Sequence, residues 1–526
     1  MNSAAIQRVV TLEEAASLTP QQVLDLYHTL YGEIIALKQQ LDWFKRQLFG
    51  QKSERRIDIG SPGQMSLGEW LTQPTLPEPP SRLIAAHTRK AATQRPDDGD
   101  TVPFFDETRV PVEVIELPAP ATEGVSPGDY EIISHKESYR LAQRPGSYVV
   151  IKYRRPVVKL KASEALVCAP APSNVIDGSR ADVSFVAGLL IDKFADHLPL
   201  YRQHQRLADA GFTLSRPWLT QIAQQGAALL EAIYEAQWAS IRESRVKAMD
   251  ETPIKAGQGG PAKLKRGYFW PVHGERDEIC FPFFESREIK HVEAALGLTP
   301  AERAVLLSDG YHAYAHYAAK TGITHAQCWA HTRRGFFEAQ AAEPEAAAEA
   351  LALIGELYQV GEDIRQAGLK GERKMDHRLA HAKPVVERFF AWIDERFAVQ
   401  GLLPSNPLTK ALAYARDRRL GLEVFLTDPD VPIDTNHLER ALRVIPMGRR
   451  NWMFCWTELG ARHVGILQSL IVTCRLHGIN PYDYLVDVLQ RIGQHPAERV
   501  HELTPRCWKA LFAANPLRSP LHRQAP

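Results

Sequence analysis

Between residues 244 and 330, short apolar runs of strand length alternate with helical segments, and this alternation constrains the fold more than any other feature of the chain. Strands are expected at Val246–Asp250, Tyr268–Val272, Ile279–Phe284, Ala304–Ser308 and His325–Trp329, with helices at 288–296 and 311–318. Strands separated by helices pack as an α/β layer. The run at 304–308 is almost wholly apolar, so we expect it to be a buried strand.

Length and composition set the class of protein. The 526 residues, of which 44% are hydrophobic, suffice for a sizeable core and suggest about three domains. No run of 18 or more apolar residues and no secretory leader is present, so we expect no membrane segment. The six cysteines are scattered and never form a CxxC pair, which excludes a disulfide framework and favours a reducing cytoplasm.

The net charge of +1 gives no sign of a nucleic-acid partner, so any such partner must be bound by a locally basic surface. Between His135 and Lys161 the chain has eight Lys or Arg residues and one acid, Glu137. Strands are expected in this region at 130–134, 148–153 and 157–160. A solvated strand face explains part of this bias, but contact with a DNA backbone explains it better.

An apolar heptad seam occupies residues 20–50. Its members follow the 4, 3 spacing of a and d positions: Val23, Tyr27, Leu30, Ile34, Leu37, Leu41, Phe44 and Leu48. An amphipathic helix packed on its own domain gives the same pattern, but the length of the seam favours a zipper for self-association.

Residues 182–236 are expected to be helical. The segment 198–210 stops at Gly211, and Ser215 is a good N-cap for a second helix that has Pro217 in its first turn. Two helices joined by a short glycine turn are compatible with a DNA-binding helix-turn-helix, and any helical hairpin gives the same signal.

Two aspartates stand at the ends of apolar strands. Asp250 ends one strand and is followed by Glu251, while Asp309 ends another. The carboxyl ends of strands in open sheets are where ligands bind, so two such carboxylates on neighbouring strands would face one pocket. Each aspartate alone could equally begin a turn or cap the next helix.

A third carboxylate, Glu439, is expected on a helix that Asp434 could cap. Asn436 and Arg443 share a helical face with Glu439. A surface helix with a Glu439–Arg443 ion pair is the simpler interpretation, worth only a few tenths of a kcal/mol. It leaves unexplained the basic residues Arg449 and Arg450, which follow without an intervening acid.

Three carboxylates suit phosphodiester chemistry. Two hard cations about 4 Å apart can stabilise the attacking and leaving oxygens and activate a water or a 3′-hydroxyl. Magnesium prefers oxygen ligands and keeps several waters, so a few Asp and Glu side chains hold it.

The acidic blocks Asp250-Glu251-Thr252-Pro253, Ser308-Asp309-Gly310-Tyr311 and Asn436-His437-Leu438-Glu439-Arg440 resemble those of DDE transposases. More closely, the chain resembles the TnpC-type transposase of the Insertion Sequence 66 family. Further matching blocks are Phe49 to Glu54, Lys193 to Gln203, Cys328 to Arg334, Arg450-Asn451-Trp452 and Gly478 to Pro481. The resemblance spans nearly the whole chain.

The resemblance implies an α/β RNase H-like catalytic core at 241–335 and 430–456, with a large helical insertion at 336–429. Around it we expect a zipper helix at 1–56, a proline-rich basic linker at 57–128, a basic β-rich element at 129–172, helices with a helix-turn-helix at 173–240, and a C-terminal helical region at 457–526. It also implies a catalytic and metal-binding triad of Asp250, Asp309 and Glu439, magnesium as cofactor with manganese able to substitute, and transposon-end and target DNA as partners.

Other partners follow from the same sources. The zipper predicts a homo-oligomer, the resemblance implies small accessory transposition proteins, and a bacterial cytoplasmic protein would associate with the nucleoid when on DNA. Residues expected to support the pocket or bind DNA are His331, Arg333, Arg334, Asn436, Arg440, Arg443, Arg449 and Arg450.

The chain departs from the family in one respect. Its members usually carry a cysteine-rich zinc-binding module before the catalytic region, whereas residues 112–170 contain only Cys168. We therefore expect no zinc there. Cys328 and His331 form a CxxH pair without nearby partners, which favours a core cysteine beside a pocket histidine over a zinc site.

Three other functions are compatible with some of these features. A glycosidase needs two carboxylates and explains neither the third nor the basic segments. A DNA-binding remnant without catalysis would not need the acidic residues. A nuclease that hydrolyses without joining uses the same metal site, so the sequence alone leaves it open.

Overall fold

The computed structural model describes Thr19 and residues 104–522, apart from 109, 120–121, 123–125, 127, 145, 162–163, 261–262, 399–403, 453–454 and 456. The chain divides into two units, Met1–Ile84 and Ala85–Pro526, and the description concerns the second. The zipper predicted at residues 20–50 and the linker up to residue 103 lie outside the described residues.

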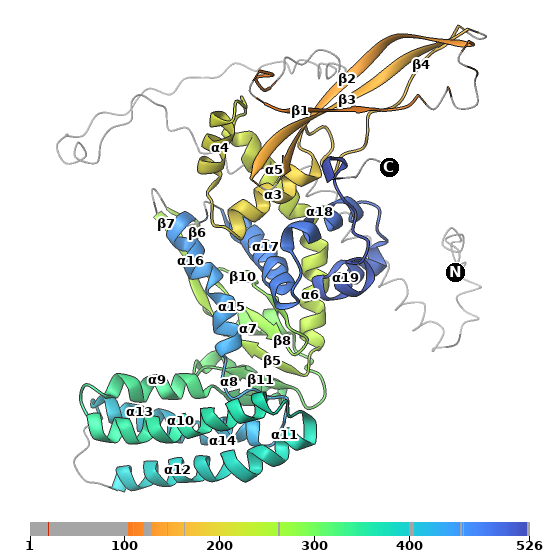
Figure 1. Ribbon diagram of the computed structural model, residues 1–526. Helices are drawn as coiled ribbons and strands as arrows, with labels where there is room; N and C mark the ends of the chain where they lie inside the picture. The colour runs from red at the N-terminus through yellow and green to blue at the C-terminus, as the bar shows by residue number, and fades with distance from the viewer. Residues whose placement is uncertain are drawn as a thin grey trace, which may run out of the picture. The chain divides into compact units, whose positions relative to one another are not determined.

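A four-stranded sheet opens the described part. It contains β1 (Val112–Glu116), β2 (Tyr130–Arg144), β3 (Ser147–Leu160) and β4 (Leu166–Cys168), in the order β1-β3-β2 with β4 also on β3. The long antiparallel ribbon of β2 and β3 is seen in Figure 1. The basic region is therefore β-rich as expected, but β1 lies inside the segment predicted to be linker.

Two predicted strands are joined in β3, which runs through Pro156. On one side β3 pairs with β1 up to Arg154, and with β4 from Val157 onward. Pro156 falls in the gap between these partners. Because no neighbouring strand is present on that side, the missing N–H of proline costs no ladder hydrogen bond.

Four helices follow: α3 (Val183–Phe194), α4 (Leu200–Asp209), α5 (Arg216–Leu229) and α6 (Glu231–Glu243). Ser215 is the N-cap of α5, and its side chain accepts a hydrogen bond from the backbone N–H of Trp218 at 3.4 Å. Trp218 stacks on Phe185 of α3 with ring centroids 5.8 Å apart. The predicted pair of helices exists, and its role in DNA recognition stays a prediction.

The central sheet has the order β12-β11-β5-β8-β9. Its strands are β5 (Val246–Met249), β8 (Val272–Gly274), β9 (Glu278–Cys280), β11 (Val305–Ser308) and β12 (Thr324–Gln327). β11 is parallel to both β5 and β12, whereas β8 is antiparallel to β5 and to β9. With α7 (Ile289–Leu296) and α8 (His312–Thr321), which pack on each other, this is the α/β layer expected from the sequence.

A second, three-stranded sheet is built from two strands that lie between β5 and β8 in the chain and from one strand that follows β9. Its strands β6 (Thr252–Gly260), β7 (Lys263–Phe269) and β10 (Phe283–Phe284) have the order β10-β7-β6. The strands predicted at 268–272 and 279–284 are thus each divided between two sheets. The divisions fall at Pro271 and Pro282, residues that cannot donate to a ladder.

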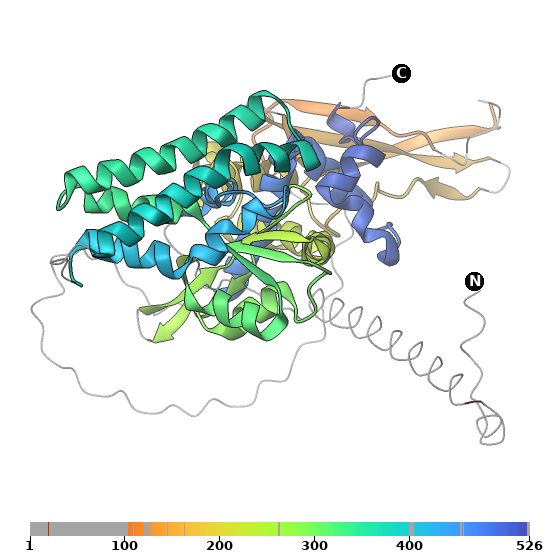
Figure 2. The ribbon, with the colours of Figure 1, turned by 90° about the horizontal axis from the view of Figure 1, so that it is seen from below.

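The segment predicted as a helical insertion is helical. The helix α9 (Trp329–Ala339) leads into it from the end of the predicted core. The segment itself contains α10 (Pro344–Gln366), α11 (Gly371–His377), the π-helix η3 (Arg378–Ala382), α12 (Lys383–Ala398), α13 (Pro407–Asp417), α14 (Arg419–Glu423) and the 3-10 helix η4 (Val424–Leu426). Figure 2 shows α10 and α12 side by side. The strand predicted at 325–329 ends at Gln327, and α9 begins at Trp329.

After the insertion the chain continues in helices. These are α15 (Asn436–Leu442), α16 (Val444–Trp452), α17 (Glu458–Leu476), α18 (Pro481–Arg491), α19 (Pro505–Leu511) and the 3-10 helices η5 (Ala497–Leu503) and η6 (Pro520–His522). Apolar around its circumference, α17 packs against β9 and lies in the core. Across the described residues, no helix has the length and apolar character needed to span a membrane.

Candidate active site

Asp250 and Asp309 follow neighbouring parallel strands at the same edge of the central sheet. Leu307 of β11 is registered with Ala248 of β5, so the same register continued by two residues sets Asp309 opposite Asp250. Both strands are fully buried while the two aspartates are only partly so. The sheet therefore delivers two carboxylates side by side from a rigid base.

Burial raises the pKa of the Asp250 carboxyl to about 7, and the negative charges of Glu251, Asp309 and Glu439 add to this increase. The backbone N–H of Glu251, which donates to Asp250 Oδ1 at 2.7 Å, lowers the pKa and so opposes them. Several carboxylates therefore interact electrostatically at one place, which is the arrangement that a bound cation relieves.

Local hydrogen bonds fix Asp309. Its Oδ1 accepts from the backbone N–H of Tyr311 at 2.9 Å. A Cβ at Gly310, between them, would lie 2.6 Å from Nε of Arg418, so the arginine side chain would have to move to admit it. Arg418 in turn donates to the Gly310 carbonyl at 3.3 Å. The loop that carries Asp309 is thus held by the helical insertion.

Glu439 lies on α15, and its carboxylate faces two side chains of α9. Its Oε1 lies 3.9 Å from Nε2 of His331, and its Oε2 lies 3.8 Å from Nη2 of Arg334. Thr435 donates its hydroxyl to Glu439 Oε1 at 3.4 Å, and Cys328 lies 3.2 Å from the same hydroxyl. Buried Cys328 thereby connects the starts of α9 and α15, as a core cysteine would.

His331 lies between the acidic residues. Burial lowers the pKa of its imidazole, while the charges of Asp309 and Glu439 oppose this effect. Its Nδ1 is buried without a hydrogen-bond partner in the structure. His331 and Arg334 were both expected to line the pocket, and the structure places both beside Glu439.

The other predicted supporting residues are more dispersed. Arg333, Arg440, Arg443 and Arg450 are exposed. Arg449 donates to the backbone carbonyl of Pro253 at the start of β6. Arg449, which was predicted to bind DNA, therefore forms a hydrogen bond to the protein backbone in the structure.

The start of α15 differs from expectation by one residue. Thr435 is the N-cap, although Asp434 accepts a hydrogen bond from the backbone N–H of Asn436 at 3.0 Å. The side-chain amide of Asn436 also bonds to Asp434. Asn436 is therefore bound to Asp434 at the start of the helix.

A fourth carboxylate at this edge has no role in the sequence interpretation. Glu251 directly follows Asp250, and only 5% of its side chain is exposed. It forms an ion pair with Arg287 and accepts the hydroxyl of Tyr314 at 2.6 Å. Burial raises the pKa of its carboxyl. The sequence signal was present, since Glu251 stands next to Asp250 at the same strand end.

The carboxylates at this end of the sheet are the candidate ligands of a metal ion. Among the residues that the structure describes, no group of three or more His, Cys, Asp or Glu side chains is placed so that it could hold a metal. The carboxylate oxygens of Asp250, Asp309 and Glu439 are nevertheless of the kind that magnesium prefers, and burial together with the neighbouring negative charges raises the pKa of Asp250. The donor chemistry fits a hard cation.

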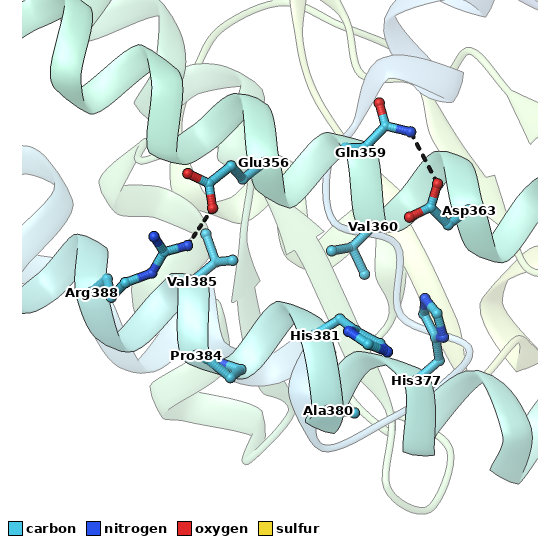
Figure 3. Close-up of a pocket in the computed structure, with 10 residues that line it drawn as sticks. All are labelled: Glu356, Gln359, Val360, Asp363, His377, Ala380, His381, Pro384, Val385 and Arg388. Atoms are coloured by element: carbon cyan, nitrogen blue, oxygen red, sulfur yellow. Dashed lines mark hydrogen bonds and ion pairs between the residues drawn. The ribbon is translucent and has the colours of Figure 1, made fainter.

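A separate cleft of about 480 Å³ lies in the insertion between α10 and α12 (Figure 3). Its lining includes His377, His381 and Asp363, with an ion pair between Glu356 and Arg388 at one end. None of the three catalytic candidates lines this cleft. It is therefore distinct from the acidic site at the sheet edge.

Comparisons with known families agree across most of the chain. A family model described as "Transposase IS66 family" matches residues 178–463, and one described as "IS66 C-terminal element" matches residues 469–506. A third, described as "Transposase C of IS166 homeodomain", matches residues 36–108, most of which lie outside the described residues.

Related chains come from Sinorhizobium fredii (strain NBRC 101917 / NGR234). "Uncharacterized protein y4jD" is 29% identical over 521 residues, which cover 94% of this chain and 98% of the relative. "Uncharacterized protein y4qI" is 30% identical over 412 residues, covering 75% of this chain and 74% of the relative. Their names assign no function.

Among solved structures, the "Drosophila P element transposase strand transfer complex" covers 67% of this chain and 90% of that chain at 11% identity. The TM-score is 0.20. A similarity this weak carries no argument about the fold or the site.

Proposed function

Because the chain belongs to the IS66 family of transposases, we propose that it binds transposon-end DNA and cleaves and joins phosphodiester bonds at Asp250, Asp309 and Glu439. The observation that carries the catalytic part is the register of β5 and β11, which aligns the two aspartates at one sheet edge. The electrostatic effect of Glu439 on Asp250 supports its place as the third member.

We further propose that the central sheet is the RNase H-like core of a DDE enzyme. Its support is a five-stranded mixed sheet in which β8 alone runs against the other strands. Acidic residues end its two adjacent parallel strands, and a large helical insertion separates them from the helix of Glu439. Placement of acids at strand ends is what such a site requires.

In this proposal Asp250, Asp309 and Glu439 hold magnesium, for which manganese can substitute. When bound, the metal would stabilise charge on the attacking and leaving oxygens and lower the pKa of the attacking water or 3′-hydroxyl. The chain's own residues orient the carboxylates. Tyr311 N–H fixes Asp309, and His331 and Arg334 face the two oxygens of Glu439.

DNA is bound by charge outside this site. Exposed Arg440, Arg443 and Arg450 follow Glu439 in the sequence, and exposed Arg333 lies on α9 next to Arg334; all four offer guanidinium groups to phosphates. The proposal includes target DNA, self-association through the zipper of residues 20–50, and small accessory proteins as partners.

The experiment that tests this function is cleavage and strand transfer on a labelled duplex carrying the element's own terminal repeat, with magnesium or manganese. Wild-type protein is compared with Asp309→Ala and with Glu302→Ala. Exposed Glu302 precedes β11 at the opposite edge of the same sheet, so it is a matched acidic control. We expect joined products with wild type and Glu302→Ala, and DNA binding without cleavage with Asp309→Ala.

Other outcomes select the rival functions. Specific binding without cutting by the wild type, with either metal and with the accessory proteins supplied, would identify a DNA-binding remnant. Cleavage without joined products would identify a hydrolysing nuclease. Full activity of Asp309→Ala would remove this residue from the proposed triad.

A further inference from the structure

The three-stranded sheet that begins directly after Asp250 has an unusual charge distribution. From Thr252 to Gly274 the chain contains four cations, Lys255, Lys263, Lys265 and Arg266, and no acid. All four are exposed. A solvated hairpin normally mixes both signs, so this stretch of sequence with cations alone requires an explanation.

One face of this sheet is continuous. Register pairs Pro253 with Tyr268 and Lys255 with Arg266, so these four residues share a face. The opposite face carries buried Ile254 and Phe269 toward the core. Because the opposite face is buried, the backbone of the sheet directs the side chains of Lys255 and Arg266 toward solvent.

The same face leads to the acidic site. Arg287 lies over the ring of Tyr311 at 4.3 Å and over that of Tyr268 at 5.8 Å. It also forms an ion pair with Glu251, the neighbour of Asp250. Tyr311 is two residues from Asp309 and donates its hydroxyl to the Arg287 carbonyl at 2.6 Å. Arg287 thus connects Glu251, beside the acidic site, to the rings of Tyr311 and Tyr268, and Tyr268 shares its face of the sheet with Lys255 and Arg266.

A second basic element is fastened to the edge of this sheet. Cys455 forms a parallel bridge with Ala256 of β6, with hydrogen bonds of 2.9 Å to the Lys255 carbonyl and 3.2 Å from Gly257 N–H. Arg449 of α16 bonds to the Pro253 carbonyl. From Arg440 to Thr457 this segment also contains no acid. Glu458, 3.6 Å from Lys265, then ends the acid-free segment.

We propose that this face of the β10-β7-β6 sheet, with Tyr311, Arg287, Tyr268, Arg266 and Lys255, is a track for the DNA strand that flanks the cleaved phosphodiester. The inference rests on the function proposed above and extends it to a named surface. Cations contact the phosphates, and the two tyrosine rings offer stacking to unpaired bases next to the cut.

The geometry sets the reach of the track. Five residues of extended chain separate Asp250 from Lys255, which corresponds to about 17 Å. Successive phosphates along B-DNA rise about 3.4 Å, so the track reaches about five base pairs from the cleavage site. Contacts to phosphates carry no base readout, so the track strengthens binding irrespective of flanking sequence.

The test is the salt dependence of DNA binding, measured with the Asp309→Ala background so that cleavage does not intervene. The variant Lys255→Gln/Arg266→Gln is compared with the parent and with Lys383→Gln/Lys410→Gln, which removes two exposed cations from the insertion. We expect the slope of log K against log salt to fall in magnitude by about 2 in the first variant only, because each lost phosphate contact changes it by about 0.9.

A charge-preserving variant and a footprint complete the test. Lys255→Arg/Arg266→Lys should keep the parental slope, which excludes misfolding as the cause of the loss. Hydroxyl-radical protection should retreat toward the cleavage site by a few base pairs in Lys255→Gln/Arg266→Gln. If the parent binds the terminal repeat and Lys255→Gln/Arg266→Gln has the same slope and footprint as the parent, the track is wrong and the proposed function stands. No binding by the parent would overturn the proposed function together with it.

Discussion

A carboxylate at the end of a buried strand loses hydration. Asp250 and Glu251, which are adjacent in the chain, both do so at the end of β5. Glu251 is compensated by Arg287 and by the hydroxyl of Tyr314, both at hydrogen-bonding distance. Hydrogen bonds to a charged group are worth roughly 1.5–3 kcal/mol each, more than those between neutral groups. Tyr314 therefore acts as a positioning residue, since it orients Glu251 at the strand end that also carries Asp250.

This assignment predicts the result of Tyr314→Phe. Loss of the hydroxyl leaves Glu251 buried with Arg287 alone, so the free energy of unfolding should fall by about 1–3 kcal/mol. Cleavage should fall roughly ten- to a hundredfold, the usual cost of losing a residue that orients a metal site. Urea denaturation and the labelled-duplex assay measure the two effects.

The matched control lies one turn further along the same helix. Tyr317 is equally buried, and its hydroxyl donates to the Gly297 carbonyl at 2.7 Å, away from the acidic site. Tyr317→Phe should lower stability by about 1 kcal/mol and leave cleavage unchanged. Equal cleavage by the two variants would show that Tyr314 has only a structural role.

At the scale of single residues, the sequence predicts a site residue when its position at the end of a strand or on a helix face identifies it. Asp250 and Asp309 are recognisable because each ends a short apolar run. The partners of Glu439 depend on tertiary packing: His331 and Arg334 precede it by about a hundred residues in the chain. Helical spacing favoured Arg443 as the partner of Glu439, because spacing along the sequence identifies only neighbours on the same helix.

Among the elements, α17 packs most closely against the central sheet. Gly465 makes this possible, because a Cβ there would lie 2.3 Å from the carbonyl oxygen of Phe281. Ser469, one turn on, accepts the backbone N–H of Phe281 at 2.9 Å. The helix therefore supplies the hydrogen bond that the edge of β9 would otherwise lack, and it can do so only while Gly465 is small.

Gly465→Ala should consequently destabilise the protein. The helix must shift away from Phe281, and overpacking of this kind costs roughly 1–3 kcal/mol despite the better helix propensity of alanine. Gly355→Ala in α10 is the control, because nothing lies within 4 Å of its added Cβ. The control should gain about 0.5–1 kcal/mol. Urea midpoints that rise in both variants would contradict the close approach of α17.

Most elements were predictable, and the exceptions have a common cause. The helices α7, α8, α17 and α18 and the buried strands β5 and β11 follow from periodicity and length. Strand ends in the β regions were misplaced where the partner strand decides them. Pro156 interrupts no ladder because β3 has no partner at this residue on the side away from β2, whereas Pro271 and Pro282 mark the passage between sheets. Local propensity cannot distinguish these two situations.

Over the whole molecule, several histidines are buried without charge. Burial lowers the pKa of His273 to about 3, and that of His325 and of His463 to about 4. They lie on β8, on β12 and in α17, so they sample most of the core around the central sheet. Each must take up a proton when the chain unfolds in mild acid.

Stability should therefore fall as the pH decreases. A pKa below the unfolded value of about 6.5 gives a contribution that is fully present above pH 6.5 and is lost as pH falls toward the folded pKa. Asp250 acts in the opposite sense, because its pKa of about 7 lies above the unfolded value and its protonation relieves repulsion below pH 7. Among these four groups, the three histidines each take up a proton on unfolding and Asp250 releases one, so their combined effect is a net uptake of two protons.

The free energy of unfolding should thus fall by about 3 kcal/mol per pH unit between pH 5.5 and 4.5, since each proton contributes about 1.4 kcal/mol per unit. Urea denaturation at the two pH values measures this slope. His463→Met removes one titrating group and should reduce the slope by about 1.4 kcal/mol per unit. Leu467→Met, at a buried position of the same helix, exchanges one apolar side chain for another and should leave the slope unchanged. If His463→Met and Leu467→Met share the wild-type slope, then the acid sensitivity does not arise from burial of this imidazole in the core.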